Sequence, residues 1–98
     1  MAEAPDDAER LRVHVHVTGR VQGVGFRATT SRHANQHGAA GWVRNLDDGR
    51  VEAVFEGPPD VVEAMVEFCH EGSRAARVDD VTVETEQPVG LSGFDVRR

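Results

Sequence analysis

Apolar and polar residues alternate near the start of the chain. The apolar positions are Leu11, Val13, Val15 and Val17, and the polar positions are Arg12, His14, His16 and Thr18. A period of two is typical of a strand that packs one face on the core, so we expect a first strand here. Residues 1–10 are acidic and lack such a pattern, and we expect them to form a disordered tail.

A helix is expected next, from about Phe26 to His37. Gly38 follows it directly and suits the left-handed conformation in which helices often end. The apolar face of this helix is thin and consists of Phe26, Ala28, Thr30 and Ala34. Its contribution to the core therefore comes from few side chains.

Two strands joined by a tight turn are expected after this helix. Residues 40–44 have the composition of a second strand, and Asp-Asp-Gly at 47–49 is typical of a turn. The apolar residues of a third strand are Val51, Ala53 and Phe55. Glu52 and Glu56 are out of phase with them, so we expect both carboxylates on the outside.

A second helix is expected after the helix-breaking residues 57–60, Gly-Pro-Pro-Asp, with Asp60 as its N-cap. It runs to about Glu71, and Gly72 closes it. The residues at core spacing are Val62, Met65, Val66 and Cys69.

The last two strands complete a recognisable order. A fourth strand is indicated by Val78, Val81 and Val83, and a short fifth by Phe94 and Val96. The order β-α-β-β-α-β with a terminal strand predicts an α+β, ferredoxin-like fold. Two helices would then cover one face of a mostly antiparallel sheet. Many functions use this fold, so the function must be argued from the site.

Length and composition narrow the class of protein. A chain of 98 residues fits one domain, expected over residues 11–98, with one modest core. No apolar run is long enough for a membrane span or a secretory signal, so we expect no membrane association. A single cysteine excludes an internal disulfide and agrees with a reducing cytoplasm. We expect a cytoplasmic monomer.

The charge of the chain is acidic and unevenly placed. The net charge is −6, and all 11 basic residues are arginine. This composition is typical of a salt-rich cytoplasm, with codon bias as the alternative. Residues 12–50 nevertheless carry six arginines against two aspartates, a balance of +4. A positive segment in an acidic protein favours a small anionic ligand and argues against nucleic acid.

The positive segment contains a glycine-rich loop, residues 19–27, with the sequence Gly-Arg-Val-Gln-Gly-Val-Gly-Phe-Arg. Three glycines let the backbone turn tightly and present its N–H groups to an anion. Arg27 adds a planar fork that binds two phosphate oxygens at once, beside an expected helix N-terminus. The loop lacks the Lys-Ser/Thr of a nucleotide-binding loop, so a phosphate group is indicated rather than a nucleoside, and a purely structural turn is the alternative.

Asn45 is a candidate partner for this loop. In the split βαβ order, the first and third strands are neighbours and the second pairs with the third, which places Asn45 near the loop. Its amide can accept a hydrogen bond from water and donate one to an oxyanion, which suits it to orient a nucleophile. The alternative is an asparagine that holds its own turn.

Together the two segments strongly resemble the acylphosphatase family. The matching elements are residues 17–27, Val-Thr-Gly-Arg-Val-Gln-Gly-Val-Gly-Phe-Arg, and residues 41–45, Gly-Trp-Val-Arg-Asn, followed by Gly49, Val51 and Gly57. The likeness extends from about Arg12 to Arg98, including residues 76–80 and 93–96. The resemblance implies hydrolysis of carboxyl-phosphate anhydrides to a carboxylate and inorganic phosphate, without metal or cofactor.

The resemblance also implies roles for individual residues. Phosphate would be bound by the backbone N–H groups of Arg20, Val21, Gln22, Gly23 and Val24, and by the side chain of Arg27. Arg27 and Asn45 would be the catalytic residues, with Asn45 holding the attacking water. Two positions depart from the family pattern: Ala28 replaces a frequent aromatic residue, and Leu46 replaces a frequent hydroxyl residue.

Three other groups of residues raise the question of metal or thiol chemistry. The histidine pairs His14/His16 and His33/His37 each share one face, but no carboxylate or cysteine completes an obvious set. We therefore expect surface histidines and no metal. Only four residues separate Cys69 from Arg74, one fewer than a cysteine-phosphatase loop needs, so we expect a buried, inert thiol.

Two rival functions remain at this point. One is a noncatalytic anion-sensing or interaction domain of the same fold, such as occurs within larger carbamoyl-transferring maturation proteins. The chain ends soon after its last expected strand, so we expect a freestanding domain instead. The other rival, an RNA-binding module, lacks support because Trp42 and the four phenylalanines are expected in the core rather than in a stacking platform.

Overall fold

The computed structural model describes residues 9–98. Its elements are β1 (Leu11–Arg20), α1 (Phe26–His37), β2 (Ala40–Asn45), β3 (Val51–Gly57), α2 (Pro59–Glu71), β4 (Arg77–Glu86) and β5 (Phe94–Val96). The expected order of elements and the ferredoxin-like α+β fold are confirmed. Most of the expected tail lies outside the described residues, so that expectation stays a prediction.

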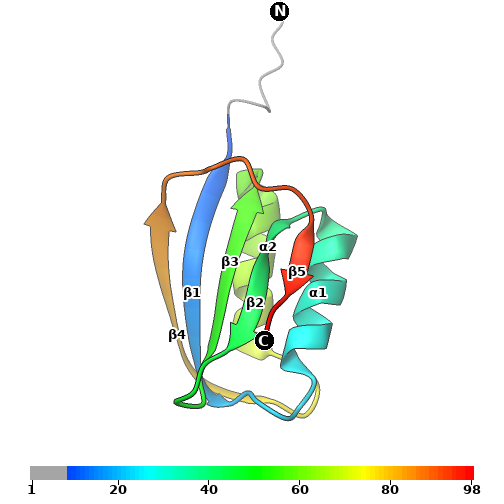
Figure 1. Cartoon of the computed structure of the whole chain (residues 1–98), viewed down its shortest axis with the longest axis vertical. Coiled ribbons are helices and arrows are strands. Elements are labelled where there is room, and N and C mark those ends of the chain that lie inside the picture. Colours follow the sequence, from blue (N-terminus) through cyan, green and yellow to red (C-terminus); the bar gives the residue numbers. More distant parts are fainter. Residues whose placement is uncertain (1–8) are drawn as a thin grey trace, which may run out of the picture.

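The five strands form one sheet in the order β4-β1-β3-β2-β5, with both helices on one face (Figure 1). β3 is antiparallel to β1 and to β2, so β1 and β2 run in the same direction. Their C-terminal ends therefore meet at one edge of the sheet. At this edge β1 continues into the glycine-rich loop and β2 ends at Asn45.

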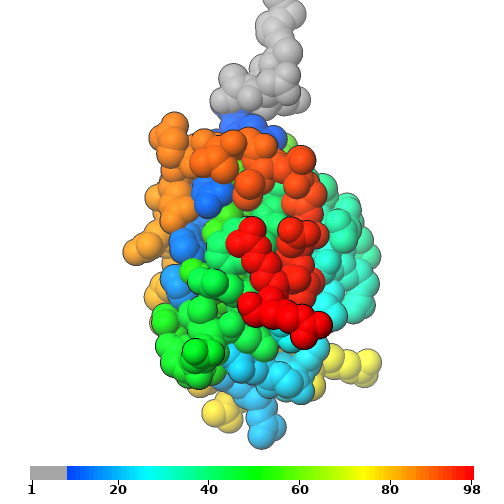
Figure 2. Space-filling model, in the orientation of Figure 1, coloured from blue at the N-terminus to red at the C-terminus, as the bar shows by residue number. Residues whose placement is uncertain are grey.

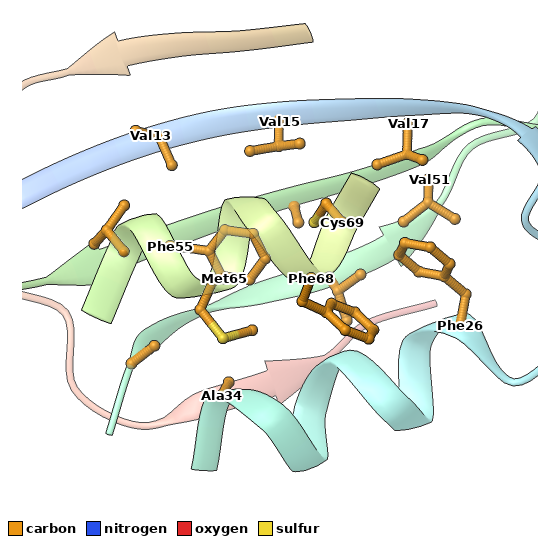
Figure 3. Close-up of a cluster of buried hydrophobic side chains, with 14 of the residues drawn as sticks. Val13, Val15, Val17, Phe26, Ala34, Val51, Phe55, Met65, Phe68 and Cys69 are labelled. Carbon is orange, nitrogen blue, oxygen red and sulfur yellow. The ribbon is translucent and has the colours of Figure 1, made fainter. Parts of the chain in front are cut away.

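The core lies between the helices and the sheet (Figure 3). β1 contributes the expected alternating valines, and α1 contributes Phe26, Thr30 and Ala34. Thr30 is tolerated there because its hydroxyl donates a hydrogen bond to the Phe26 carbonyl at 2.7 Å. The buried residues of α2 are Val62, Met65, Phe68 and Cys69. Val66 was expected among them but is only half-buried, and Phe68 fills the space beside Phe26 instead, with ring centroids 5.6 Å apart.

The helix ends agree with expectation except at the start of α2. Gly38 caps α1 in the left-handed conformation, and Gly72 ends α2. The prediction that Asp60 is the N-cap is wrong: Pro58 takes that position and Asp60 lies within the first turn. The reason is that Pro59 is suited to the first helical position, where its missing N–H group has no intrahelical partner to lose. Within residues 9–98, neither helix is long and apolar enough to cross a membrane.

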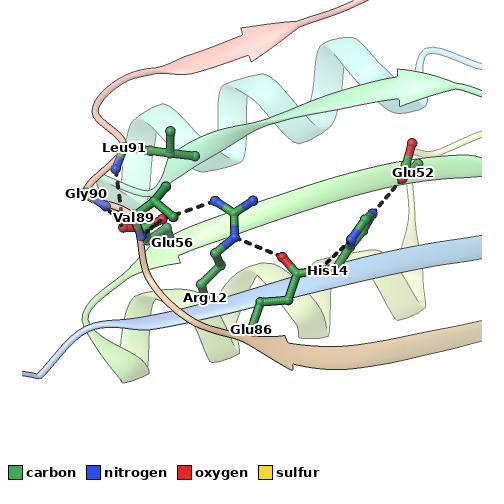
Figure 4. A network of polar contacts seen from close by, with 8 residues as sticks. All are labelled: Arg12, His14, Glu52, Glu56, Glu86, Val89, Gly90 and Leu91. Carbon is green, nitrogen blue, oxygen red and sulfur yellow. Dashed lines mark hydrogen bonds and ion pairs between the residues drawn. The ribbon is translucent and has the colours of Figure 1, made fainter.

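The sheet face away from the helices, called the open face below, is more covered than the sequence predicts. Glu52 and Glu56 lie on this face, as expected, but they are only 7% and 0% exposed. The Glu56 carboxylate accepts hydrogen bonds from the backbone N–H groups of residues 89–91 and from Arg12 (Figure 4). Both carboxylates lie outside the core, as expected, but they are covered: the β4–β5 connection folds over Glu56, and His14 and Arg44 pair with Glu52.

Trp42 also lies on the open face rather than in the core, where it was expected. Trp42 is half-buried and contacts two guanidinium groups, those of Arg44 and Arg97, whose Cζ atoms lie 5.4 and 4.6 Å from the ring centroid. Arginines cover an aromatic face in this way through cation–π attraction and their apolar stems. The phenylalanines follow expectation more closely, since Phe26, Phe55 and Phe68 are buried.

Candidate active site

A cavity of about 390 Å³ opens at the edge where β1 and β2 end and α1 begins. Its lining residues are Val21, Gly23, Gly25, Phe26, Arg27, Ala28, Asn45, Val96 and Arg98. The C-terminal residues follow β5, which pairs with β2, and Figure 2 shows them in red on the surface between β2 and the start of α1. No side chain that lines the cavity is acidic and two are arginines, so these side chains favour an anion.

The glycine-rich loop reaches the cavity in a conformation that needs glycine. Gly23 and Gly25 have φ values of 73° and 77°, in the left-handed region, and a Cβ at either position would meet nothing within 4 Å. The requirement is therefore conformational and leaves space open above the backbone. Within the described part of the chain, the backbone N–H groups of residues 21–25 donate no hydrogen bond to protein. Several unpaired donors on one turn are what an oxyanion requires.

The start of α1 adds to this positive character. Gly25 is its N-cap and provides no side-chain oxygen, and the first turn contains no acidic residue. The first N–H groups of a helix have no intrahelical acceptor, and together with the helix dipole they attract anions. The first three residues of α1, 26–28, all line the cavity. The helix N-terminus is therefore part of the site.

Arg27 lies at the cavity and is fixed by the C-terminal segment. Its Nη1 donates a hydrogen bond to the Arg97 carbonyl at 3.1 Å. Residue 97 is itself tied to β2, because its N–H group donates to the Val43 carbonyl at 2.8 Å. A guanidinium has five N–H donors, so this contact orients the side chain and leaves donors for a ligand.

Asn45 ends β2 inside the same cavity. Its Oδ1 is buried and, within residues 9–98, has no hydrogen-bond partner. An unpaired buried acceptor costs about 1–3 kcal/mol and is uncommon in native structures, so it calls for a functional explanation. The alternative that Asn45 holds its own turn is not supported, because Asp48 does so by accepting the backbone N–H of Arg50 at 3.1 Å.

Two side chains that sequence reasoning missed hold the glycine-rich loop in place. Gln22 Nε2 donates to the carbonyls of Leu46 and Arg50, at 2.7 and 2.9 Å, and so ties the loop to the β2–β3 turn. On the other side, the buried Ser73 donates its hydroxyl to the Val24 carbonyl at 2.8 Å. A loop held from both sides keeps its N–H groups oriented before an anion arrives.

The structure brings together some of the sequence-predicted residues and adds others. The predicted residues that line the cavity are Val21, Gly23, Arg27 and Asn45. The predicted residues whose atoms do not line it are Arg20, Gln22 and Val24, and those that were not predicted are Gly25, Phe26, Ala28, Val96 and Arg98. The C-terminal pair was missed because it reaches the site through parallel pairing of β5 with β2, which has no local sequence signal.

The two residues that depart from the family pattern, Ala28 and Leu46, contact the site in different ways. Ala28 lines the cavity as an exposed residue of α1, so its small side chain leaves that wall open. Leu46 takes part through its backbone: its carbonyl accepts from Gln22, and its N–H donates to Arg50 at 2.8 Å. Neither departure removes a polar contact that the structure shows at the cavity.

Cys69 plays no part in this site. Its side chain is fully buried, and burial raises the pKa of its thiol to about 12. A thiol with so high a pKa is not a nucleophile at neutral pH. The prediction of a buried, inert thiol is confirmed.

Known proteins share both the sequence and the fold. The family profile described as Acylphosphatase matches residues 13–96. The chain is similar to an acylphosphatase of Haloarcula marismortui, with 69% identity over 86 residues, 88% of this chain and 94% of the relative. It is also similar to one of Trichormus variabilis, with 60% identity over all of this chain and 97% of the relative. An acylphosphatase structure from Coxiella burnetii superposes with a TM-score of 0.90 at 35% identity, over 97% of this chain and all of that one.

Proposed function

The chain belongs to the acylphosphatase family, and we propose that the cavity at the end of β1 and β2 is where it hydrolyses acyl phosphates. The activity itself is that of its relatives: an acylphosphatase cleaves the carboxyl-phosphate bond to a carboxylate and inorganic phosphate. The comparisons lend no support to a noncatalytic domain. What we add is the assignment of the reaction to particular residues.

Phosphate is bound by the glycine-rich loop and Arg27. The unpaired N–H groups of residues 21–25 and the N-terminus of α1 support this assignment, since together they form a preorganised set of donors. The assignment covers the backbone of Arg20 to Val24 and the guanidinium of Arg27. Phosphoryl transfer spreads charge over the equatorial oxygens, and these donors stabilise it there.

Asn45 orients the attacking water, and its unpaired buried Oδ1 is the observation that carries the proposal. A water molecule that donates a hydrogen bond to Oδ1 has a lone pair free to attack phosphorus. Such positioning supplies much of the rate in a reaction that needs little covalent help from the protein.

The reaction needs no strong acid or base from the protein. The leaving group is a carboxylate with an ordinary pKa near 4, so it departs without being protonated. The transition state is loose, so the water need not lose its proton early. This agrees with a cavity whose lining contains an amide and arginines but no acidic side chain. Proton transfer from the water to a phosphate oxygen completes the reaction.

Steady-state hydrolysis of benzoyl phosphate in the presence of EDTA tests these roles. Arg27→Ala should nearly abolish both turnover and the binding of inorganic phosphate. Asn45→Ala should lower kcat about a hundredfold or more while inorganic phosphate still inhibits, because one positioned group is lost but the anion site is kept. Arg32→Ala and Asn35→Ala, at exposed positions of α1, are the matched controls.

The outcomes separate the roles from the activity. Wild-type rates in both Arg27→Ala and Asn45→Ala would refute the mechanism even if the wild-type protein hydrolyses benzoyl phosphate. Loss of phosphate inhibition in Asn45→Ala would assign Asn45 to phosphate binding instead of water.

We further propose that the protein acts as a monomer in the cytoplasm and binds neither nucleic acid nor membranes. Its relatives of similar length are acylphosphatases that act on small molecules, which supports the first part. The net charge of −6 supports the second, because it opposes the binding of polyanions. Sedimentation and an RNA filter-binding assay test the two parts.

A further inference from the structure

The open face of the sheet holds a second cluster of functional-type side chains, outside the cavity. His14 and His16 lie on β1, and Glu52 lies on β3 directly opposite His16. The Glu52 Oε2 is 2.6 Å from His14 Nε2 and 3.6 Å from His16 Nε2. Sequence reasoning found the two histidines but no third ligand, because Glu52 becomes their neighbour only through the pairing of β1 with β3.

We propose that His14, His16 and Glu52 bind a divalent transition-metal ion of the zinc type. Two imidazoles and one carboxylate are a donor set that Zn²⁺ accepts in proteins, with a fourth position left to water. The three donor atoms lie within 4.8 Å of one another. None of these residues lines the cavity, so the metal site is separate from the site of hydrolysis.

The two imidazoles must tilt to bind one ion, because their rings are stacked with centroids 5.0 Å apart and an interplanar angle of 20°. Zinc–ligand bonds of about 2.0–2.2 Å in a tetrahedron place ligand atoms about 3.3 Å apart. The 3.6 Å between His16 and Glu52 is close to this value, and the 2.6 Å between His14 and Glu52 must lengthen by a fraction of an ångström. The histidine side chains are 23% and 27% exposed, which gives the ion an entry path and its fourth ligand, water.

The surroundings already orient the ligands. Glu86 of β4 holds Nδ1 of His14 at 2.9 Å, which is the carboxylate–histidine contact that commonly supports a metal-bound imidazole (Figure 4). Arg44 of β2 holds Oε1 of Glu52 at 2.5 Å and leaves Oε2 for the metal. These contacts come from strands on both sides of the histidines, so His14 Nδ1 and Glu52 Oε1 are held by partners that do not compete for the ion.

Metal binding takes the place of a proton. Burial alone would lower the pKa of His14, but its hydrogen bonds to Glu86 and Glu52 outweigh this and raise it. The protonated ring donates to a carboxylate from each nitrogen. The metal needs the lone pair of Nε2, so the ring loses that proton to solvent while Nδ1 keeps its hydrogen for Glu86.

The single tryptophan provides a local probe. Trp42 lies edge-on to His14, with ring centroids 6.0 Å apart, and it is the only tryptophan of the chain. A paramagnetic ion such as Cu²⁺ bound at the cluster should quench its fluorescence. The rival histidine pair, His33 and His37, lies on α1, across the sheet from this face.

The test is calorimetric titration of the EDTA-stripped and desalted full chain with ZnCl₂, together with Cu²⁺ quenching of Trp42. One Zn²⁺ per chain should bind, and His16→Gln should weaken binding by about tenfold or more, since it removes a ligand. His37→Gln should leave affinity and quenching unchanged. Thermal unfolding shows whether His16→Gln is folded. Glu86→Gln provides a second test, because it removes no ligand but should also weaken zinc binding under the proposal. Absence of saturable binding, equal affinity in His16→Gln, or loss of binding in His37→Gln would each overturn the proposal.

Discussion

Gln22 is expected to couple the loop that we propose to bind phosphate to Asn45, which we propose to orient the water. Its side chain joins the loop to Leu46 and Arg50, and Leu46 directly follows Asn45. Gln22→Met keeps the length of the side chain and removes both N–H donors. The substitution changes no other residue of the loop that is proposed to bind phosphate. It therefore tests the link from the loop to the β2–β3 turn rather than the anion site itself.

The structure sets the size of the expected effect. Each of the two hydrogen bonds contributes about 1 kcal/mol, so about 2 kcal/mol of stability is lost. The loss should not be larger, because the Leu46 carbonyl still accepts from Gly49 and the Arg50 carbonyl from Leu46. For a domain of this size, 2 kcal/mol corresponds to a fall in Tm of about 8–16 °C.

Activity should fall as well. Displacing a reacting group by about 1 Å can cost about a hundredfold in rate. Asn45 is also held by its pairing with Val51 in the β2–β3 ladder, so we expect a smaller loss, about tenfold in kcat/KM. If Gln22 acts through Asn45, the same substitution should cost little more in an Asn45→Ala background.

Thermal unfolding and benzoyl phosphate hydrolysis of the single and double variants measure both effects. Gln36→Met, at an exposed position of α1, is the control and should change neither. Wild-type Tm and kcat/KM in Gln22→Met would show that the two contacts do not position the site. Independent, multiplicative losses in the double variant would show that Gln22 does not act through Asn45.

Two further predictions concern stability. Burial alone would raise the pKa of Glu56, but the N–H groups of Gly90 and Val89 and the Arg12 guanidinium hold this pKa below its ordinary value. The stability that ionised Glu56 contributes is therefore complete above its pKa in the unfolded chain, and it is lost as the pH falls through its pKa in the folded protein. Glu56→Gln should cost about 2 kcal/mol at pH 7 and flatten the acid dependence of unfolding, whereas exposed Glu84→Gln should do neither. The acidic, lysine-free composition suggests adaptation to high salt, and a 69% identical relative comes from a halophilic archaeon. Tm should therefore rise strongly between low and molar KCl. A flat response would favour codon bias as the cause of the composition.

Much of the fold was predictable because its signals are local. The alternation of apolar and polar residues over 11–17 marks the first strand, and the glycine at 38 marks the end of the first helix. The proximity of Asn45 to the glycine-rich loop was also predictable, since the split βαβ order fixes which strands are neighbours. The helix start at Pro59 was not, because two adjacent signals, a proline and an aspartate, compete there.

The open face was not predictable, because alternation tells only which way a side chain points. Glu52 and Glu56 have the polar phase of a solvated strand face, and the sequence does not show that residues 89–91 cross over Glu56. The same holds for Trp42, which lies on the polar face of its strand because two arginines cover its ring there. Burial on this face depends on long-range contacts of arginine and of backbone N–H groups, which leave no periodic pattern.

The open face and the edge where β1 and β2 end differ in how their polar groups are satisfied, and this difference supports the proposed location of the active site. On the open face, the buried carboxylate of Glu56 accepts three backbone N–H groups and a guanidinium, as stability requires. At the edge where β1 and β2 end, the described structure instead shows a buried, unpaired Asn45 oxygen in the cavity, beside a loop whose N–H groups at residues 21–25 donate to no protein acceptor. The buried Asn45 oxygen carries a cost that a protein tolerates where a bound water supplies the missing partner, so this unpaired acceptor supports the proposed catalysis at this edge independently of the sequence resemblance.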